Sequence, residues 1–346
     1  LWRLRVVKIL SSIRVHGSSL SSAEIAEGQR VSLAAADYFE QQGDWESFSL
    51  ALDGYMGVSY RGGMHRDVIQ AGERRLNAPT LTAMERGDAL QSIVWAHHNL
   101  GDYERCIAFG YEALRQTQPG ESLIHVTLAV AVAMQAACFS GQWAACVDFM
   151  PSIEEIRNQI QDESGARLLT PAYMSALHLA MARDDRAAAD VAAAFLRRIL
   201  PTPSESPVSA IIDACREDDP AKADSANFPF AATVMLPLQF FTERGLAPPD
   251  AVLDYIQREP ECGSIDLIVR CREIALALAA ADTARLAAAI DDAESHGLIP
   301  HAARMRIILA QLTQNPTPLE QARPVLERLQ DRQFLRRLEE VATSLR

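Results

Sequence analysis

Near its carboxyl-terminal end the sequence gathers the residue types that bind metal ions. Asp291, Asp292, Glu294, His296 and His301 carry carboxylates and imidazoles, which are common ligands of divalent metals. The five residues straddle the end of a predicted helix and the turn after it, and such side chains commonly lie at helix ends as solvated charge. We therefore predict no metal site and no cofactor.

Sequence patterns that mark catalytic or nucleotide-binding loops do not occur in this chain. There is no G-x-G-x-x-G, Walker A, G-x-S-x-G or H-E-x-x-H pattern. The segment 201–227 offers acids and a serine, but without the spacing of a nucleophile and its base: Asp213, Glu217, Asp218, Asp219 and Ser225. We expect a non-catalytic chain, and an enzyme with a site in this segment is the weakest of three alternatives.

The composition favours a soluble helical protein. Of the 346 residues, 49% are hydrophobic and 23% are charged, as in globular domains, and alanine runs such as 187–189 favour helix. Aromatic residues make up 6%, which is too few for a typical β-sandwich or barrel. The net charge of −12 argues against direct binding of nucleic acid, because affinity for phosphate comes from clustered Lys and Arg.

Six cysteines show neither a C-x-x-C pair nor a zinc-site spacing: Cys106, Cys138, Cys146, Cys215, Cys262 and Cys271. Most occupy alanine-like positions, so we interpret them as buried, reduced thiols of a cytoplasmic protein. We expect no signal peptide, find no uninterrupted apolar stretch of about 20 residues, and predict no membrane partner. The absence of an initiator Met suggests a fragment, with a catalytic domain outside it.

Short turns divide the chain into helices at a regular spacing. At 43–45, 101–103 and 141–143 a glycine ends one helix, a polar residue can cap the next, and an aromatic residue opens that helix. Weaker turns lie at 63–65, 184–186 and 281–283. From Gly63 to Gly101 is 38 residues, from Gly101 to Gly141 is 40, and from Gly141 to Asp184 is 43. A recurrence of this length predicts repeated antiparallel helix pairs that stack to form a core.

One of these units resembles a tetratricopeptide (TPR) repeat. The stretch 90–119 has a large residue early in its first helix, the Gly-Asp-Tyr turn at 101–103, a small residue followed by isoleucine at 106–107, Ala113-Leu114 and the closing Pro119. The resemblance implies an all-α fold, a right-handed superhelix of antiparallel helix hairpins. The longer repeats resemble the helical sensor regions of large bacterial signalling ATPases of the maltose-regulon-activator type and of class III nucleotidyl cyclases, over about 23–200 and 263–345.

We expect four segments along the chain. Residues 1–22 are an N-terminal remnant or a leading helix, and 23–200 are TPR-like repeats. Prolines and serines break the pattern over 201–262, an irregular connection with short helices. Residues 263–346 form C-terminal hairpins and a capping helix, for which we predict helices at 264–281, 283–296, 302–313, 318–329 and 331–344.

The resemblance also implies a concave groove lined by the first helix of each pair. In this chain, the corresponding positions combine stacking rings with hydrogen-bonding groups, which suits a peptide or a compact polar ligand. The predicted groove residues are Asp53, Tyr60, Arg61, Gln91, Trp95, His98, Asn99, Gln135, Phe139 and His178. Adjacent residues on a helix point about 100° apart, and the alignment assigns His97 to packing and His98 to the groove.

These observations favour a non-catalytic binding scaffold, the sensory or coupling segment of a bacterial signalling or regulatory protein. A protein or peptide partner is expected, together with a possible small-molecule effector. The alternative is an autonomous protein–protein adaptor without a small ligand. Each aromatic groove residue has two interpretations: its ring packs against neighbouring helices, or its ring binds a ligand.

Overall fold

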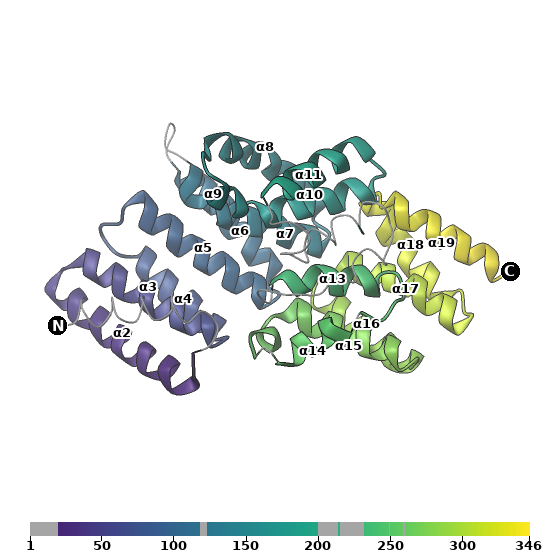
Figure 1. The fold of residues 1–346 in the computed structure, drawn as a ribbon, viewed down its shortest axis with the longest axis horizontal. Coiled ribbons are helices and arrows are strands. Elements are labelled where there is room, and N and C mark those ends of the chain that lie inside the picture. The colour runs from purple at the N-terminus through teal and green to yellow at the C-terminus, as the bar shows by residue number, and fades with distance from the viewer. Residues whose placement is uncertain (1–19, 118–122, 200–213, 215–231, 249, 259) are drawn as a thin grey trace. The chain divides into compact units, whose positions relative to one another are not determined.

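The computed structural model describes residues 20–117, 123–199, 214, 232–248, 250–258 and 260–346. These ranges are mostly α-helix and contain no β-strand (Figure 1). The all-α, TPR-like fold class is thereby confirmed. Most of the predicted segments 1–22 and 201–262 lie outside the described residues. The chain divides into two compact units, residues 1–133 and 134–346, which we describe separately.

Unit 1 is a series of helices in which each helix packs on the next. It contains α2 (Ser22–Gln42), α3 (Trp45–Arg61), α4 (His65–Leu76), α5 (Ala83–Asn99), α6 (Tyr103–Gln116) and the short 3₁₀ helix η1 (Leu123–Val126). Contacts join each of α2 to α6 to its neighbour in sequence, and α3 also contacts α5. The first helices of two successive pairs therefore lie side by side, as the repeat pattern predicts.

Local signals in the sequence explain where these helices begin and end. The Oδ1 atoms of Asp44 and Asp102 accept hydrogen bonds from the backbone N–H groups of Ser47 and Arg105, at 3.3 and 3.4 Å, and so cap α3 and α6. Gly43 and Gly101 have φ angles of 67° and 73°, the left-handed region that glycine adopts without a steric penalty. The turns predicted at 43–45 and 101–103 are present.

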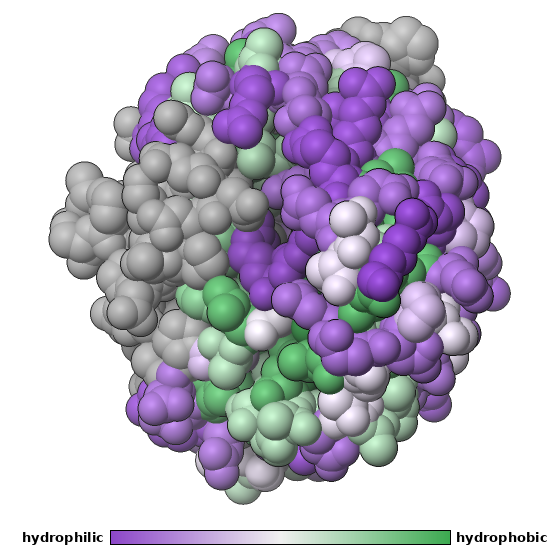
Figure 2. Space-filling model, turned by 90° about the vertical axis from the view of Figure 1, so that its right-hand side faces the viewer, coloured by the Kyte–Doolittle hydropathy of each residue, from purple (hydrophilic) through white to green (hydrophobic). Residues whose placement is uncertain are grey.

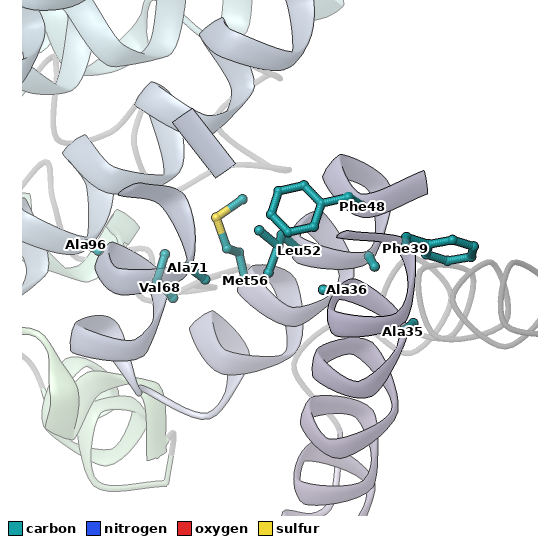
Figure 3. Close-up of a cluster of buried hydrophobic side chains, with 10 residues drawn as sticks. Ala35, Ala36, Phe39, Phe48, Leu52, Met56, Val68, Ala71 and Ala96 are labelled. Atoms are coloured by element: carbon teal, nitrogen blue, oxygen red, sulfur yellow. The ribbon is translucent and has the colours of Figure 1, made fainter. Parts of the chain in front are cut away.

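The core of unit 1 is apolar. Phe48, Leu52 and Met56 of α3 pack with Phe39 of α2 and Val68 of α4, and each side chain is at most 6% exposed (Figure 3). Alanines 35, 36, 51, 71 and 96 fill the remaining positions and let the helices approach closely. Stacked helices, rather than any single pair, supply this core.

Unit 2 repeats the hairpin architecture with different helix lengths. The helix α7 (Thr127–Ser140) spans the division between the units, and unit 2 continues with α8 (Trp143–Gln159), α9 (Glu163–Arg167), α10 (Thr170–Ala182), α11 (Arg186–Ile199), α13 (Ala232–Thr242), α14 (Asp250–Arg258), η3 (Pro260–Ser264), α15 (Asp266–Ala279), α16 (Thr283–Ser295), α17 (Ile299–Thr313), α18 (Thr317–Leu329) and α19 (Arg332–Ser344). Helices α15 to α19 pack consecutively, and α10 packs on α11.

The C-terminal helices of unit 2 return to an earlier helix. Contacts join α19 to α10 and to α17, and join α13 to α15. One face of α19 is buried through Phe334, Leu338 and Val341. The sequence predicts α19 as a polar cap, and its other face is indeed exposed. This buried face packs with α17 and α18, and α19 also contacts α10, one of the helices on which the sequence places groove residues.

Several turns of unit 2 adopt left-handed backbone without glycine. Asp184, Ala281, Gln314 and Gln330 have φ angles of 62°, 50°, 52° and 57°. Each ends a helix of a hairpin, where this conformation lets the chain reverse. Among residues 20–117 of unit 1, positive φ angles occur at the glycines 43, 63 and 101.

Among the described residues, one segment is apolar and long enough to cross a membrane, Leu123–Ser140, with a mean hydropathy of 1.8. Because 78% of it is buried inside the protein, as in a core helix, it is weak evidence for a membrane span. Figure 2 views the end of the molecule that carries α18 and α19, and there hydrophilic side chains cover most of the described surface.

Candidate functional site

Half of the predicted groove residues form one face of unit 1. Asp53, Tyr60 and Arg61 come from α3, and Gln91 and Trp95 come from the adjacent α5. All five side chains are partly exposed. We call these five residues the α3–α5 face.

Two aromatic rings form the centre of this face. The ring centroids of Tyr60 and Trp95 are 6.1 Å apart at an interplanar angle of 85°, an edge-to-face contact. The side-chain amide of Asn99 donates to the Tyr60 hydroxyl at 3.3 Å, which helps to fix the tyrosine ring. Among residues 20–117, no ion pair or hydrogen bond of the Arg61 side chain is recorded. The face therefore combines two held rings with an available guanidinium.

A buried arginine that sequence reasoning missed organises the acidic end of the face. Arg75 of α4 is 4% exposed, and its Nη1 lies 2.6 Å from Asp88 Oδ2 and 3.5 Å from Asp53 Oδ1. Its Nε donates to Ser49 Oγ at 2.9 Å. Because Arg75 is shared by both carboxylates, it links the helices α3, α4 and α5. In the sequence, the only indication of this role is that Arg75 is a charged residue among the apolar positions of α4 that face the core.

His98, another predicted groove residue, is buried together with Asn99. The two side chains are 2% and 1% exposed. Burial disfavours the charged imidazole and lowers the pKa of His98 to about 4, so this ring is neutral at pH 7. His97 stacks on Phe109 and contacts the Asp102 carboxylate, as expected for a packing residue. Trp95 and Gln91, rather than His98, are therefore partly exposed at the surface of α5.

The three remaining predicted residues belong to unit 2, and two of them are buried. Gln135 and Phe139 of α7 are 6% and 5% exposed. His178 of α10 is partly exposed, and its Nε2 lies 2.7 Å from Nη1 of Arg304 on α17. The position that the sequence assigns to a ligand thus holds a side chain of the protein itself.

Arg304 is the centre of a buried ionic network in unit 2. It is 1% exposed, and its Nη1 donates to both carboxylate oxygens of Glu243, at 3.0 and 3.1 Å. Its Nε donates to Asp331 Oδ2 at 2.8 Å, and the guanidinium lies 4.6 Å from the ring centroid of Phe334. The network joins α17 to the end of α13 and to the start of α19, where Asp331 also caps the helix through the N–H of Phe334.

The second cation of the network is His301. Its Nδ1 is 3.2 Å from Glu243 Oε1, and its Nε2 is 3.5 Å from the sulfur of Cys271. Burial works against the charged form, but Cys271 and Glu243 outweigh it and raise the pKa of His301 to about 10. Both ring nitrogens then carry protons and donate to these two groups. We call Glu243, Arg304, Asp331, His301 and His178 the ionic network.

The charges of the ionic network balance one another. Burial would raise the pKa of Glu243, but the cations of Arg304 and His301 hold it well below its usual range. Burial and the neighbouring Arg304 lower the pKa of His178 to about 3, so this imidazole is neutral and accepts the arginine N–H at Nε2. Two carboxylates therefore face two cations, which is the condition under which buried charges are tolerated.

The acid and histidine residues of 291–301 pair with arginines instead of converging on one point. Arg306 binds Asp291 and Glu294, at 3.1 and 2.5 Å. Arg270 binds Asp292 at 2.6 Å and lies 3.0 Å from His296. Asp291, Asp292, Glu294 and His296 thus lie at the C-terminal end of α16 and pair it with arginines of α15 and α17.

Comparisons with known proteins give little further guidance. No family model matches the chain, and no curated protein matches its sequence. Among solved structures, a chain of the crystal structure of Rap protein complexed with competence and sporulation factor aligns over 99% of this chain and 98% of its own. The two share 14% identity at a TM-score of 0.40. At that TM-score the likeness carries no weight, so the function proposed below rests on the residues of this chain.

Proposed function

We propose that the chain is a non-catalytic binding scaffold that holds a peptide on the α3–α5 face. The observation that carries this proposal is the pair of partly exposed rings, Tyr60 and Trp95, together with Arg61, which follows Tyr60 in α3 and whose partly exposed side chain forms no ion pair or hydrogen bond within residues 20–117. Rings of this kind bury a large apolar area at a low cost in conformational entropy. Arg61 adds a charged donor beside them.

The chemistry of the face defines the peptide that it would take. An apolar or aromatic side chain of the peptide would pack against Trp95, and a carboxylate near it would accept hydrogen bonds from Arg61. Asp53 is 33% exposed at its side chain and Gln91 is partly exposed, so both can bind backbone N–H groups of an extended segment. A short segment with one acidic and one aromatic residue fits this arrangement.

A library of random 12-residue peptides, displayed on phage and selected against the full chain, tests this proposal. Selected peptides are then titrated, as fluorescein conjugates, against the wild type and the variants Trp95→Ala and Arg61→Ala. We expect each variant to weaken binding by about tenfold or more, which corresponds to about 1.4 kcal/mol.

Two matched variants serve as controls. Tyr38→Ala removes an aromatic ring that is 46% exposed on α2, and Arg66→Ala removes an exposed arginine of α4. Both should bind the selected peptides as the wild type does. Equal loss in the controls and the test variants, or no loss in either test variant, would refute a role for the α3–α5 face.

We further propose that this scaffold is the sensory or coupling segment of a cytoplasmic signalling protein, which rests on the resemblance of its repeats to such regions. A bound peptide would favour one arrangement of the helices over another, which requires different affinities for the two arrangements. An autonomous adaptor is the alternative. Native mass spectrometry separates the two: a retained small molecule or short peptide supports the sensor, and a copurifying polypeptide supports the adaptor.

A further inference from the structure

A cleft in unit 2, distinct from the α3–α5 face, has the composition of an anion site. Its volume is about 350 Å³, within the range of small-molecule sites. Four arginines and two carboxylates line it: Arg186, Arg244, Arg336, Arg337, Asp184 and Glu340. We call it the arginine cleft.

The charge of the arginine cleft is opposite to that of the protein. Four guanidinium groups against two carboxylates leave two net positive charges, in a chain whose net charge is −12. Like charges placed together repel, and concave walls concentrate the resulting field. A bound anion would relieve this repulsion.

Contacts to the protein hold two of these arginines in place. Arg337 donates to the carbonyl oxygens of Glu243 and Arg244, at 3.1 and 3.2 Å. The guanidinium of Arg244 lies 3.6 Å from the ring centroid of Phe240 and donates to its carbonyl oxygen. These contacts orient the guanidinium groups, which lowers the entropic cost of binding a ligand.

The other two arginines are accessible to a ligand. Arg336 is 56% exposed at its side chain and pairs with Asp184 at 2.7 Å, an exposed pair of the kind that contributes little to stability. Arg186 is exposed, and no hydrogen bond or ion pair of its side chain is recorded within the described residues. An incoming anion can therefore replace Asp184 at Arg336 and bind Arg186 as well.

The arginine cleft also has an inner extension. A second cavity of about 60 Å³, with Arg304, Glu243 and His178 in its wall, shares Phe334 and Arg244 with the cleft. Most of the lining residues of the cleft lie on α10, α11 and α19, whereas Asp184 and Arg244 lie in the turns that follow α10 and α13.

We propose that the arginine cleft binds a compact polyanion, the chemistry shared by phosphoryl compounds and polycarboxylates. Planar guanidinium groups match the oxygen spacing of phosphate and carboxylate, and several of them converge here. The cleft is too small for a folded polypeptide or a nucleic-acid duplex. This anion site is independent of the peptide proposed for unit 1.

Isothermal titration of the full chain with sodium pyrophosphate tests the proposal, with citrate as the second probe at low ionic strength. Saturable binding of either probe is expected. The probe that binds more tightly identifies the class of the ligand, a phosphoryl compound or a polycarboxylate. If neither probe binds at millimolar concentration, the proposal is overturned.

Two variants with opposite expected effects on affinity test whether the anion binds in the arginine cleft. Arg186→Gln combined with Arg336→Gln should weaken binding by about tenfold or more, because charge-assisted hydrogen bonds are lost. Asp184→Asn should strengthen binding severalfold, because it removes the competing carboxylate while asparagine tolerates the left-handed backbone at this position.

Arg328→Gln, an exposed arginine of α18 outside the cleft, is the matched control and should bind as the wild type does. Circular dichroism and thermal midpoints establish that each variant is folded. Equal weakening in Arg328→Gln and the double variant would mean nonspecific attraction, and unchanged binding in the double variant would place the anion elsewhere. Either outcome refutes the proposal.

Discussion

Each unit contains an apolar core cluster, and unit 2 adds a buried ionic network. In unit 1, Phe48, Leu52 and Met56 pack among alanines, and the contacts are apolar. In unit 2, Arg304 and Glu243 are buried at the junction of α13, α17 and α19 and depend on specific partners. An apolar core loses stability in proportion to the volume removed, whereas a buried ionic network fails when any one charge loses its partner.

The largest effect should follow from removing the central cation of unit 2. Arg304→Met leaves the carboxylates of Glu243 and Asp331 buried without their main partner, which should cost about 3–5 kcal/mol in the free energy of unfolding. Urea denaturation measures this loss. Arg323→Met is the control, since Arg323 pairs with Glu339 at the surface, and it should cost less than about 1 kcal/mol. Similar losses for both variants would mean that the buried network of unit 2 contributes no more to stability than a surface ion pair.

An apolar deletion in unit 1 should cost slightly less. Leu52 is 0% exposed, so Leu52→Ala removes buried methyl groups and leaves a cavity, at about 3 kcal/mol. Leu33→Ala, at a position of α2 that is 40% exposed, is the matched control and should change the urea midpoint little. If Leu52→Ala behaved like Leu33→Ala, unit 1 would not depend on this core.

Overfilling the core of unit 1 is a milder test. A Cβ atom on Gly72 would lie 2.5 Å from Ile93 Cγ1, so Gly72→Ala should cost about 1–3 kcal/mol. Adding Ile93→Ala should cost less than the sum of the two single changes, since the clash is then gone. Gly263→Ala in unit 2, where a Cβ would meet nothing within 4 Å, should be nearly neutral.

The pH dependence of stability should separate the units with the smallest signal. Because the pKa of His301 is raised to about 10, folded unit 2 keeps a proton that the unfolded chain releases above about pH 6.5. The contribution of His301 to stability is thus full below that pH and falls as pH rises, by at most about 1.4 kcal/mol per pH unit. Glu243, Cys271, Arg304 and the neutral His178 surround this group.

In unit 1, His98 has the opposite effect. Its pKa is lowered to about 4, so its contribution is full above about pH 6.5 and is lost as pH falls through about 4. Hydrogen exchange of α17 and α5 peptides, corrected for intrinsic rates, measures both units between about pH 5 and 8.5. His301→Gln should flatten the profile of α17 above pH 6.5. An unchanged profile in that variant would exclude His301 as the titrating group.

Local sequence signals predict the helices of both units well. The expected helices at 283–296, 318–329 and 331–344 correspond to Thr283–Ser295, Thr317–Leu329 and Arg332–Ser344. Glycine and aspartate mark the turns directly, and these effects act over a few residues. The adjacency of α3 and α5, which brings Tyr60 to Trp95, follows from the repeat.

Features that depend on distant residues were not predictable from the sequence. Arg304 meets Glu243 and His178 across 61 and 126 positions of the chain, and no local pattern marks such partners. The burial of His98 likewise depends on how the neighbouring helices pack, which the repeat alignment did not resolve. The predicted groove roles of the ten residues remain predictions, and those of the α3–α5 face are the ones that the exposure of their side chains favours.

The residues with left-handed backbone at the hairpin turns of unit 2 affect how well this unit tolerates destabilising substitutions. Asp184, Ala281, Gln314 and Gln330 adopt a backbone that costs an L-residue about 1–2 kcal/mol and that glycine adopts freely. Each position is thus a site where one glycine substitution could compensate for a harmful change elsewhere in the unit. Ala281, Gln314 and Gln330 do not line the arginine cleft, so a glycine at these positions would add stability without changing the lining of the cleft.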